Sequence, residues 1–305
     1  MSFSSEVKNE ICALANERKC CNKALLSGAF ALFNTVSDKQ IKMTTENASV
    51  ARYLNLLIKE TFKADTDISF RKSSKSKGFT IEITDEKIIK EISETIGLVN
   101  PKTGQIAANI NNNLVLNDCC KCAALRGAFL VAGSISDPAK GYHFEIACHR
   151  EKQIKDLFWI FSSLDIEPKI VERGSNYVLY IKEKEKVADT LNILGSKQMF
   201  FKIHDIMMEK ELRNELNRRQ NFEQANLDKT LNAAVVQTNA IKKIMETNRF
   251  SMLPDNLKEL ASLRMEYPDV SLNELASMLS ENITRSGINH RLKKIVEFAD
   301  KIKEV

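Results

Sequence analysis

Aromatic and structure-breaking residues are scarce in this 305-residue sequence, which contains one Trp, 10 Gly and 5 Pro. Aromatic residues make up 7% of the chain, so its cores must be mostly aliphatic. No apolar run approaches the roughly 20 residues that a bilayer-spanning helix requires. The first residues also lack the basic and then apolar segments of a secretory signal. We therefore expect a cytoplasmic protein that does not bind membranes.

The excess of positive charge is small, since 45 Lys and Arg against 40 Asp and Glu give +5 at pH 7. All of the excess lies in residues 1–221, which contain 33 basic and 28 acidic residues, whereas residues 222–305 contain 12 of each. A partner held by bulk charge alone is therefore not expected. The seven cysteines, an odd number in a chain expected to be cytoplasmic, argue against a disulfide framework.

Four short motifs occur twice in the chain at a nearly constant spacing. Residues 26–31 and 36–38 recur as 125–130 and 135–137, at an offset of 99, and residues 79–83 and 96–98 recur as 177–181 and 194–196, at an offset of 98. This register predicts two copies of one unit, over residues 20–100 and 119–215. An amphipathic helix within residues 1–19 precedes them, because Phe3, Val7, Ile11 and Leu14 recur at helical spacing.

Each copy is predicted to contain a helix, two strands, a helix, two strands and a helix, which makes the domain α+β with pseudo-two-fold symmetry. The expected helices are 20–33, 49–62, 87–96, 119–132, 151–164 and 186–194, and the strands with alternating or hairpin patterns are 40–44, 67–71, 79–84, 142–147, 169–173 and 177–182. The first helix of each copy is apolar nearly all round, which is typical of a buried helix. Gly28 and Gly127 lie inside these two helices, where glycine costs about 1 kcal/mol relative to alanine. A close approach of the two helix backbones would explain them.

Residues 125–133 resemble a degenerate LAGLIDADG motif, the helix at which the two halves of that homing-endonuclease fold meet. In active members of that family, the residue before the last glycine is acidic and holds a divalent metal ion. The resemblance puts Ala132 at this position in the second copy and Phe33 in the first. Two-metal cleavage needs carboxylates, so we expect no catalytic residues, no catalytic metal and no enzyme activity. Asp38 and Asp137 are interpreted as turn residues, with a divergent nuclease built on this pair as the rival hypothesis.

Residues 241–305 are predicted to form an all-helical domain. One helix begins at Pro254 and ends before Pro268, and Ser271 with Glu274 forms a capping box at the start of the next. A turn at 280–282 leads to a further helix over 285–301. This outline is typical of a helix-turn-helix, although any helical hairpin would give the same pattern.

The last helix has one apolar side, formed by Ile288, Leu292, Ile295 and Ala299, and its other side is basic. Residues 284–294 contain four Arg or Lys residues and no acid. Asn, Ser, His and Arg side chains can read base edges, while Lys more often binds phosphate; a solvated basic face is the alternative. The candidate DNA-binding residues are Arg285, Ser286, Asn289, His290, Arg291, Lys293 and Lys294.

Six segments, in order along the chain, resemble the WhiA family of bacterial DNA-binding regulators, which join a degenerate LAGLIDADG domain to a C-terminal helix-turn-helix. They are residues 2–8, 45–48, 125–130, 141–143, 210–214 and 286–292. The resemblance implies a nucleoid-associated protein with duplex DNA as its partner. It further implies roles in cell division and chromosome segregation in Gram-positive bacteria, and in transcription, including sporulation genes in some of them. It implies no cofactor and no obligate small-molecule ligand, and it leaves open other regulators or division proteins as partners.

Two further segments are candidates for additional DNA contacts. The Asn-rich interdomain segment, residues 216–240, is predicted either to pack between domains or to contact DNA through Arg218 and Arg219. The hairpin tip at 71–77 is either a solvated turn or a second contact through Lys72 and Lys75.

The duplication carries cysteines to equivalent places at the starts of the two central helices. Cys20 and Cys21 precede Gly28 as Cys119 and Cys120 precede Gly127, and Cys122 adds a further thiol. We expect symmetry to bring the two pairs together. Adjacent cysteines do not have the CxxC spacing of a zinc knuckle, so buried apolar packing without a metal is the main expectation. Metal binding or redox chemistry is the alternative that stays open.

Overall fold

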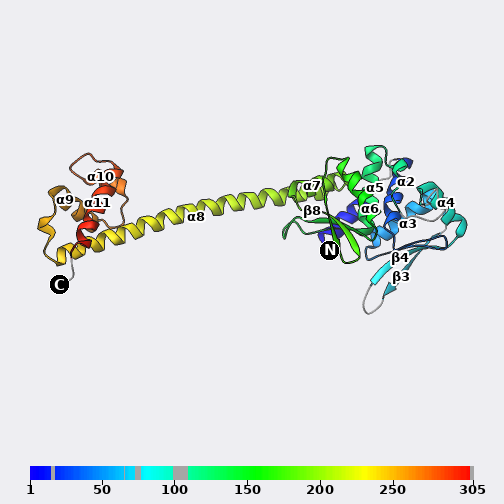
Figure 1. Cartoon of the computed structure of the whole chain (residues 1–305), viewed down its shortest axis with the longest axis horizontal. Coiled ribbons are helices and arrows are strands. Elements are labelled where there is room, and N and C mark those ends of the chain that lie inside the picture. Colours follow the sequence, from blue (N-terminus) through cyan, green and yellow to red (C-terminus); the bar gives the residue numbers. More distant parts are fainter. Residues whose placement is uncertain (15–17, 65, 73–76, 99–108, 303–305) are drawn as a thin grey trace. The chain divides into compact units, whose positions relative to one another are not determined.

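The computed structural model describes residues 1–14, 18–64, 66–72, 77–98 and 109–302 (Figure 1). The chain divides into two compact units, an N-terminal unit (Met1–Glu209) and a C-terminal unit (Lys210–Val305). Among the described residues, no helix is both long enough and apolar enough to cross a membrane.

The N-terminal unit contains the predicted duplication, and its mixed helix and sheet content confirms the predicted fold class. The first copy consists of α2 (Lys19–Ala31), β1 (Thr35–Val36), β2 (Ile41–Thr45), α3 (Ala48–Phe62), β3 (Asp67–Lys72), β4 (Lys77–Ile83) and α4 (Glu86–Ile96). The second consists of α5 (Asp118–Ala132), β5 (Gly133–Ile135), β6 (Phe144–Cys148), α6 (Glu151–Ser162), β7 (Lys169–Arg173), β8 (Asn176–Ile181) and α7 (Lys184–Ile193). Both antiparallel sheets have the same strand order, β1-β2-β4-β3 and β5-β6-β8-β7. A short 3-10 helix, η1 (Asn112–Leu114), lies between the copies in the sequence.

The two copies meet through α2 and α5, whose backbones touch at the two glycines. A β-carbon on Gly28 would lie 2.0 Å from the carbonyl oxygen of Ala124, and one on Gly127 would lie 2.0 Å from that of Leu25. Real side chains cannot approach backbone this closely, so only glycine fits at either position. The expected close approach of two helix backbones is confirmed.

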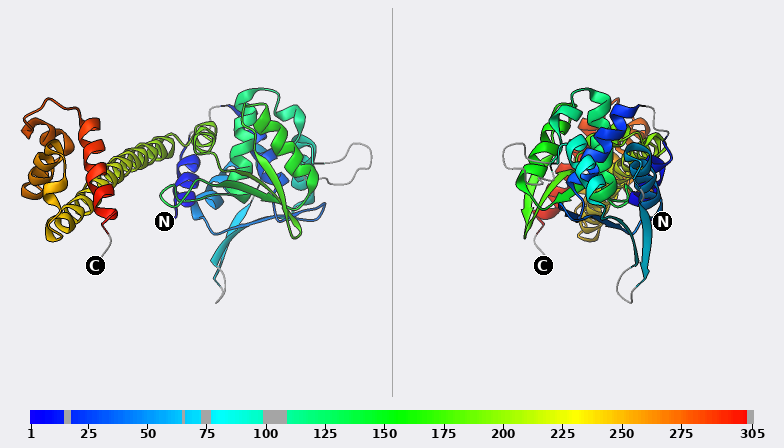
Figure 2. Two further views of the ribbon diagram at one scale, coloured as in Figure 1. Left: turned by 60° about the vertical axis from the view of Figure 1, so that its left-hand side comes forward. Right: turned by 90° about the vertical axis from the view of Figure 1, so that its right-hand side faces the viewer.

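Both sheets lie on the same side of the helices, as the left view of Figure 2 shows with the strands below them. One continuous core joins helices and sheets, and apart from phenylalanines such as Phe30, Phe129 and Phe144 it is mostly aliphatic. Helix α1 (Phe3–Cys12) adds Phe3, Val7 and Ile11 to this core, as its spacing predicts.

Helix α8 (Lys197–Glu246) is 50 residues long and runs from the N-terminal into the C-terminal unit. It passes without interruption through residues 215 and 240, where the sequence analysis divides the chain. The C-terminal unit continues with η2 (Phe250–Met252), α9 (Asp255–Glu266), α10 (Leu272–Met278) and α11 (Arg285–Asp300). These helices and the end of α8 share a second core, which contains Ile241, Leu260 and Leu292.

A lysine on α1 is held against the core of the N-terminal unit. The Lys8 ammonium lies 5.5 Å from the centroid of the Phe129 ring. Burial lowers the pKa of Lys8 from 10.5 to about 8, and the nearby Cys12 thiol opposes this only in part. Because the unfolded chain keeps the higher pKa, the charged lysine destabilises the fold below about pH 8, and this cost disappears as the pH rises from 8 to 10.5.

We therefore expect Lys8→Met to raise the free energy of unfolding by about 2 kcal/mol at pH 7 and by much less at pH 10. Urea unfolding of both proteins at the two pH values measures this difference. Lys39→Met, at an exposed turn lysine, is the control and should change stability little at either pH. An equal effect of Lys8→Met at pH 7 and pH 10 would contradict the assignment.

Candidate nucleic-acid interface

Helix α11 begins at a well-formed cap and turns one apolar side to the core. The Thr284 hydroxyl oxygen accepts a hydrogen bond from the Gly287 amide at 3.3 Å. The four residues of the predicted apolar side, Ile288, Leu292, Ile295 and Ala299, are each at most 1% exposed, which confirms that side. Six of the seven candidate residues are exposed: Arg285, Ser286, Asn289, His290, Lys293 and Lys294.

The seventh candidate, Arg291, is half-buried and engaged within the unit. Its Nη2 donates to the Glu281 carboxylate at 2.6 Å, and its side chain is 19% exposed. This ion pair ties the middle of α11 to the loop that precedes the helix. Arg291 therefore helps to position α11, and its direct contact with DNA stays a prediction.

Charge is distributed unevenly along α11. The basic residues lie between Arg285 and Lys294, whereas the acidic residues of the helix, Glu297 and Asp300, lie in its last turns. The start of a helix also carries the positive end of its dipole, and its free amides favour phosphate. The first ten residues of α11 are thus the part of the helix suited to a polyanion.

The connection before α11 is longer than the sequence predicts. Residues 279–284 join α10 to α11, in place of the expected turn at 280–282, because α10 ends at Met278 with an extended residue after it. The Ser280 amide and hydroxyl both donate to the Glu259 carboxylate at 2.9 Å, which anchors the loop to α9. The capping box at the start of α10 is confirmed, with Ser271 and Glu274 bonded reciprocally.

A buried arginine fixes the connection between α9 and α10. Arg264 is 2% exposed, and its Nη1 donates to the carbonyl oxygens of Pro268 at 3.1 Å and Val270 at 2.8 Å. Burial lowers the pKa of Arg264, with Asp269 acting in the opposite direction. This role of Arg264 was not predicted, because its partners are backbone carbonyl groups and no residue type in the sequence indicates them.

A pocket of about 380 Å³ lies between α8, α10 and α11. Arg285 and Asn289 line it from α11, Asn273 lines it from the start of α10, and Lys229 and Thr230 line it from α8. Lys229, Thr230 and Asn273 were not among the candidates, although Lys229 lies in the Asn-rich segment at 216–240. The pocket therefore joins a basic residue of that segment to the candidate face of α11.

The residues proposed from the sequence for additional DNA contacts do not line this pocket. Arg218 and Arg219 are exposed on α8, roughly 15 Å before Lys229 along the helix, and Arg219 forms an ion pair with Glu223 at 3.1 Å. Lys72 ends β3, and Lys75 lies outside the described residues.

The positions that carry metal-binding acids in active LAGLIDADG enzymes are occupied by Phe33 and Ala132. Phe33 is 7% exposed just after α2, and Ala132 ends α5. Asp137 accepts a hydrogen bond from the Ala139 amide at 2.9 Å, as a turn residue does, and Asp38 is exposed. Within the described residues, the one group of three or more potential metal ligands consists of cysteines. The carboxylates that a two-metal nuclease needs are therefore missing from these two positions.

Comparison with known families assigns all three parts of the chain. Family models match at residues 19–99 (WhiA N-terminal LAGLIDADG-like domain), 121–213 (WhiA LAGLIDADG-like domain) and 216–299 (WhiA C-terminal HTH domain). The chain belongs to the WhiA family. The third match includes the last 31 residues of α8, so the helix-turn-helix domain of this WhiA protein contains that part of α8 and the pocket it lines.

Similar WhiA proteins match over their whole length. The probable cell division protein WhiA of Thermoanaerobacter pseudethanolicus is 41% identical, covering 100% of this chain and 99% of the relative. The protein of the same description from Clostridium botulinum is 38% identical with the same coverage. The crystal structure of full-length DUF199/WhiA from Thermatoga maritima has a TM-score of 0.59 at 23% identity and covers 100% of both chains, which shows the same fold.

Proposed function

We propose that this WhiA protein binds duplex DNA through the first ten residues of α11 and acts as a regulator in cell division. The observation that carries the proposal is the exposed face of Arg285, Asn289, His290 and Lys293 on a helix that keeps its acidic residues at the other end. The relatives named probable cell division protein WhiA support the biological role. Transcriptional control, sporulation in some hosts, chromosome segregation and a location at the nucleoid belong to the same proposal.

Each exposed residue has a role that follows from its chemistry. Asn289 can pair with an adenine edge through two hydrogen bonds, and Ser286 and His290 can reach neighbouring bases. Lys293 and Lys294 bind phosphates, which fix the helix on the duplex. Arg285 and Lys229, which line the pocket from α11 and α8, would hold a phosphate of the DNA backbone at the edge of the major groove.

The N-terminal unit acts in this proposal as a non-catalytic scaffold. Phe33 and Ala132 have no oxygen or nitrogen side-chain ligand for a divalent cation, and Asp137 is engaged in a turn, where it accepts a hydrogen bond from the Ala139 amide. The unit would bind a protein partner or support the orientation of the DNA-binding helices.

A chromosome-wide map of DNA bound by the full-length protein, together with equilibrium binding to fragments from that map, tests the proposal. We expect binding that weakens steeply with salt, and recovered sites that share a sequence. We also expect DNA incubated with the protein and Mg²⁺ to remain uncut. Absence of duplex binding at low salt would sink the DNA-binding function, and strand cleavage would replace it with a nuclease function.

A further inference from the structure

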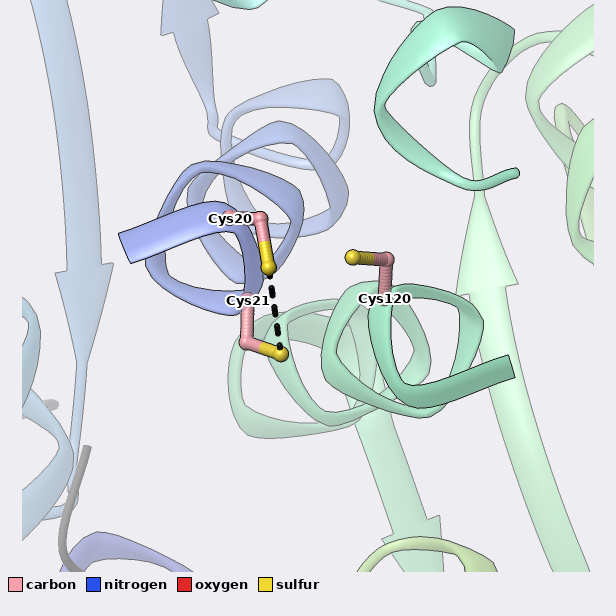
Figure 3. A group of neighbouring side chains, drawn as sticks. All are labelled: Cys20, Cys21 and Cys120. Atoms are coloured by element: carbon pink, nitrogen blue, oxygen red, sulfur yellow. Dashed lines mark hydrogen bonds between the residues drawn. The ribbon is translucent and has the colours of Figure 1, made fainter. Parts of the chain in front are cut away.

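Three cysteine thiols from the two copies converge where α2 and α5 begin, and a fourth lies beside one of them. The Sγ atoms of Cys20, Cys21 and Cys120 all lie within 4.8 Å of one another, and Figure 3 shows them in the space between the two helices. Cys119 stands next to them, with its Sγ 4.0 Å from that of Cys120. The expected meeting of the two symmetry-related pairs is confirmed.

The four cysteines are not all buried, as small apolar side chains in a core would be. Cys120 is buried, but Cys21 and Cys119 are half-buried and Cys20 is exposed. The main expectation from the sequence, that these cysteines act as buried small apolar residues, therefore holds for Cys120 and is wrong for the exposed Cys20. Packing alone gives no reason for an exposed thiol to face two others.

The spacing of the sulfur atoms matches that of thiolates around one metal ion. Zinc binds thiolates at about 2.3 Å in a tetrahedron, which sets neighbouring sulfurs about 3.8 Å apart. The Cys20 and Cys21 sulfurs are 4.0 Å apart, as are those of Cys119 and Cys120. The glycine contacts between α2 and α5, two turns further along, fix the helix backbones that carry these pairs.

Positive groups lie beside the cysteines. Both pairs lie in the first turn of a helix, where the helix dipole stabilises negative charge. Arg18 Nη1 lies 3.9 Å from the Cys119 sulfur. Burial alone would raise the pKa of Cys119, but hydrogen bonds from Cys21 and Cys120 and the charge of Arg18 outweigh it and lower the pKa. Burial, together with the neighbouring thiols, raises the pKa of Cys21 to about 11 and also raises the pKa of Cys120.

We propose that Cys20, Cys21, Cys119 and Cys120 bind one zinc ion that joins the two copies of the N-terminal unit. On binding, each thiol releases one proton to solvent and no electrons are transferred, so affinity rises with pH. The exposed Cys20 leaves an entry path for the ion. Three converging thiols with a fourth beside them favour a metal site over a disulfide, because a disulfide would use only two of the four.

Elemental analysis and cobalt substitution of the reduced full-length protein test the site. Protein purified without chelator should contain about one zinc per chain. After zinc removal, added Co²⁺ should give thiolate-to-cobalt charge-transfer absorption and the strong visible bands of tetrahedral coordination. Cys20→Ser and Cys120→Ser should each weaken zinc binding at least roughly 100-fold in a competition titration.

Cys122→Ser, in the same helix and outside the four, is the matched control and should keep both the metal content and the cobalt spectrum. Circular dichroism of each variant identifies loss of folding, and the cobalt spectrum of the wild-type protein decides the question even if the serine variants unfold. A reduced, folded protein that binds neither ion would overturn the proposal. So would metal binding that survives both substitutions, or a disulfide among these cysteines in freshly purified protein.

Discussion

Alanine at both Lys293 and Lys294 is expected to weaken duplex binding about 30-fold at physiological salt. Both side chains are exposed at the end of the stretch from Arg285 to Lys294, which contains no acidic residue. Each phosphate contact that is lost retains about one counterion on the DNA, so the slope of log affinity against log salt should fall by about 1.8. Titrations of the full-length protein with a DNA fragment at several salt concentrations measure both quantities.

Two comparison variants separate charge from sequence recognition. Lys301→Ala removes a lysine just after the opposite end of α11 and should leave the slope unchanged. Asn289→Ala should cost about 1–3 kcal/mol on the preferred site while changing the slope little, because a base contact releases no counterion. If substitution of Lys293 and Lys294 alters neither affinity nor slope, α11 does not lie against the DNA backbone.

Arg218→Ala with Arg219→Ala, in the same assay, reports whether α8 adds phosphate contacts of its own.

Alanine in place of Gly28 is expected to destabilise the N-terminal unit by about 3 kcal/mol or more. Helix propensity predicts the opposite sign, a gain of about 1 kcal/mol for glycine to alanine inside a helix. The added β-carbon would stand 2.0 Å from the Ala124 carbonyl oxygen, however, so α2 and α5 must move apart and open the core between the copies. Chemical denaturation of the full-length protein, followed by circular dichroism, measures the sign and size of the change.

Gly141→Ala is the matched control for this prediction. Nothing lies within 4 Å of a β-carbon at that position, so the substitution should change stability by less than about 0.5 kcal/mol. A Gly28→Ala protein that is as stable as the wild type would mean that the two helices are not held at the separation described above.

The sequence predicts those parts of the structure whose signal is periodic or repeated. The fixed offset between copies predicts two equal halves, mid-helix glycines predict a close helix contact, and an apolar stripe predicts the buried side of α11. Burial and close helix approach each restrict the residue type at a few regularly spaced positions. That restriction is what makes these features visible in the sequence. The apolar stripe also predicts which residues of α11 are exposed, because the side chains outside the stripe face away from the core.

Other features depend on contacts that carry no such signal. The middle of α8 is exposed from residue 211 to 233, and a helix that is polar on most sides has no apolar period by which to recognise it. The pairing of Arg291 with Glu281, ten residues away, requires the course of the loop between α10 and α11. Lys229 lines the pocket only because α8 packs beside α10 and α11. Local propensity does not determine that packing, so the sequence does not predict the pocket.

The contact of α2 with α5 at Gly28 and Gly127 makes the N-terminal unit resemble a two-fold dimer whose two subunits are joined in one chain. The surface that each copy offers at α2 or α5 is the kind of self-complementary surface found in two-fold oligomers, but here one chain supplies both sides. Connecting the copies keeps their effective concentration high, so the interface forms however dilute the protein is. It also lets the two sides diverge: Phe33 and Ala132 occupy equivalent positions with different side chains, a freedom that an assembly of identical subunits does not have.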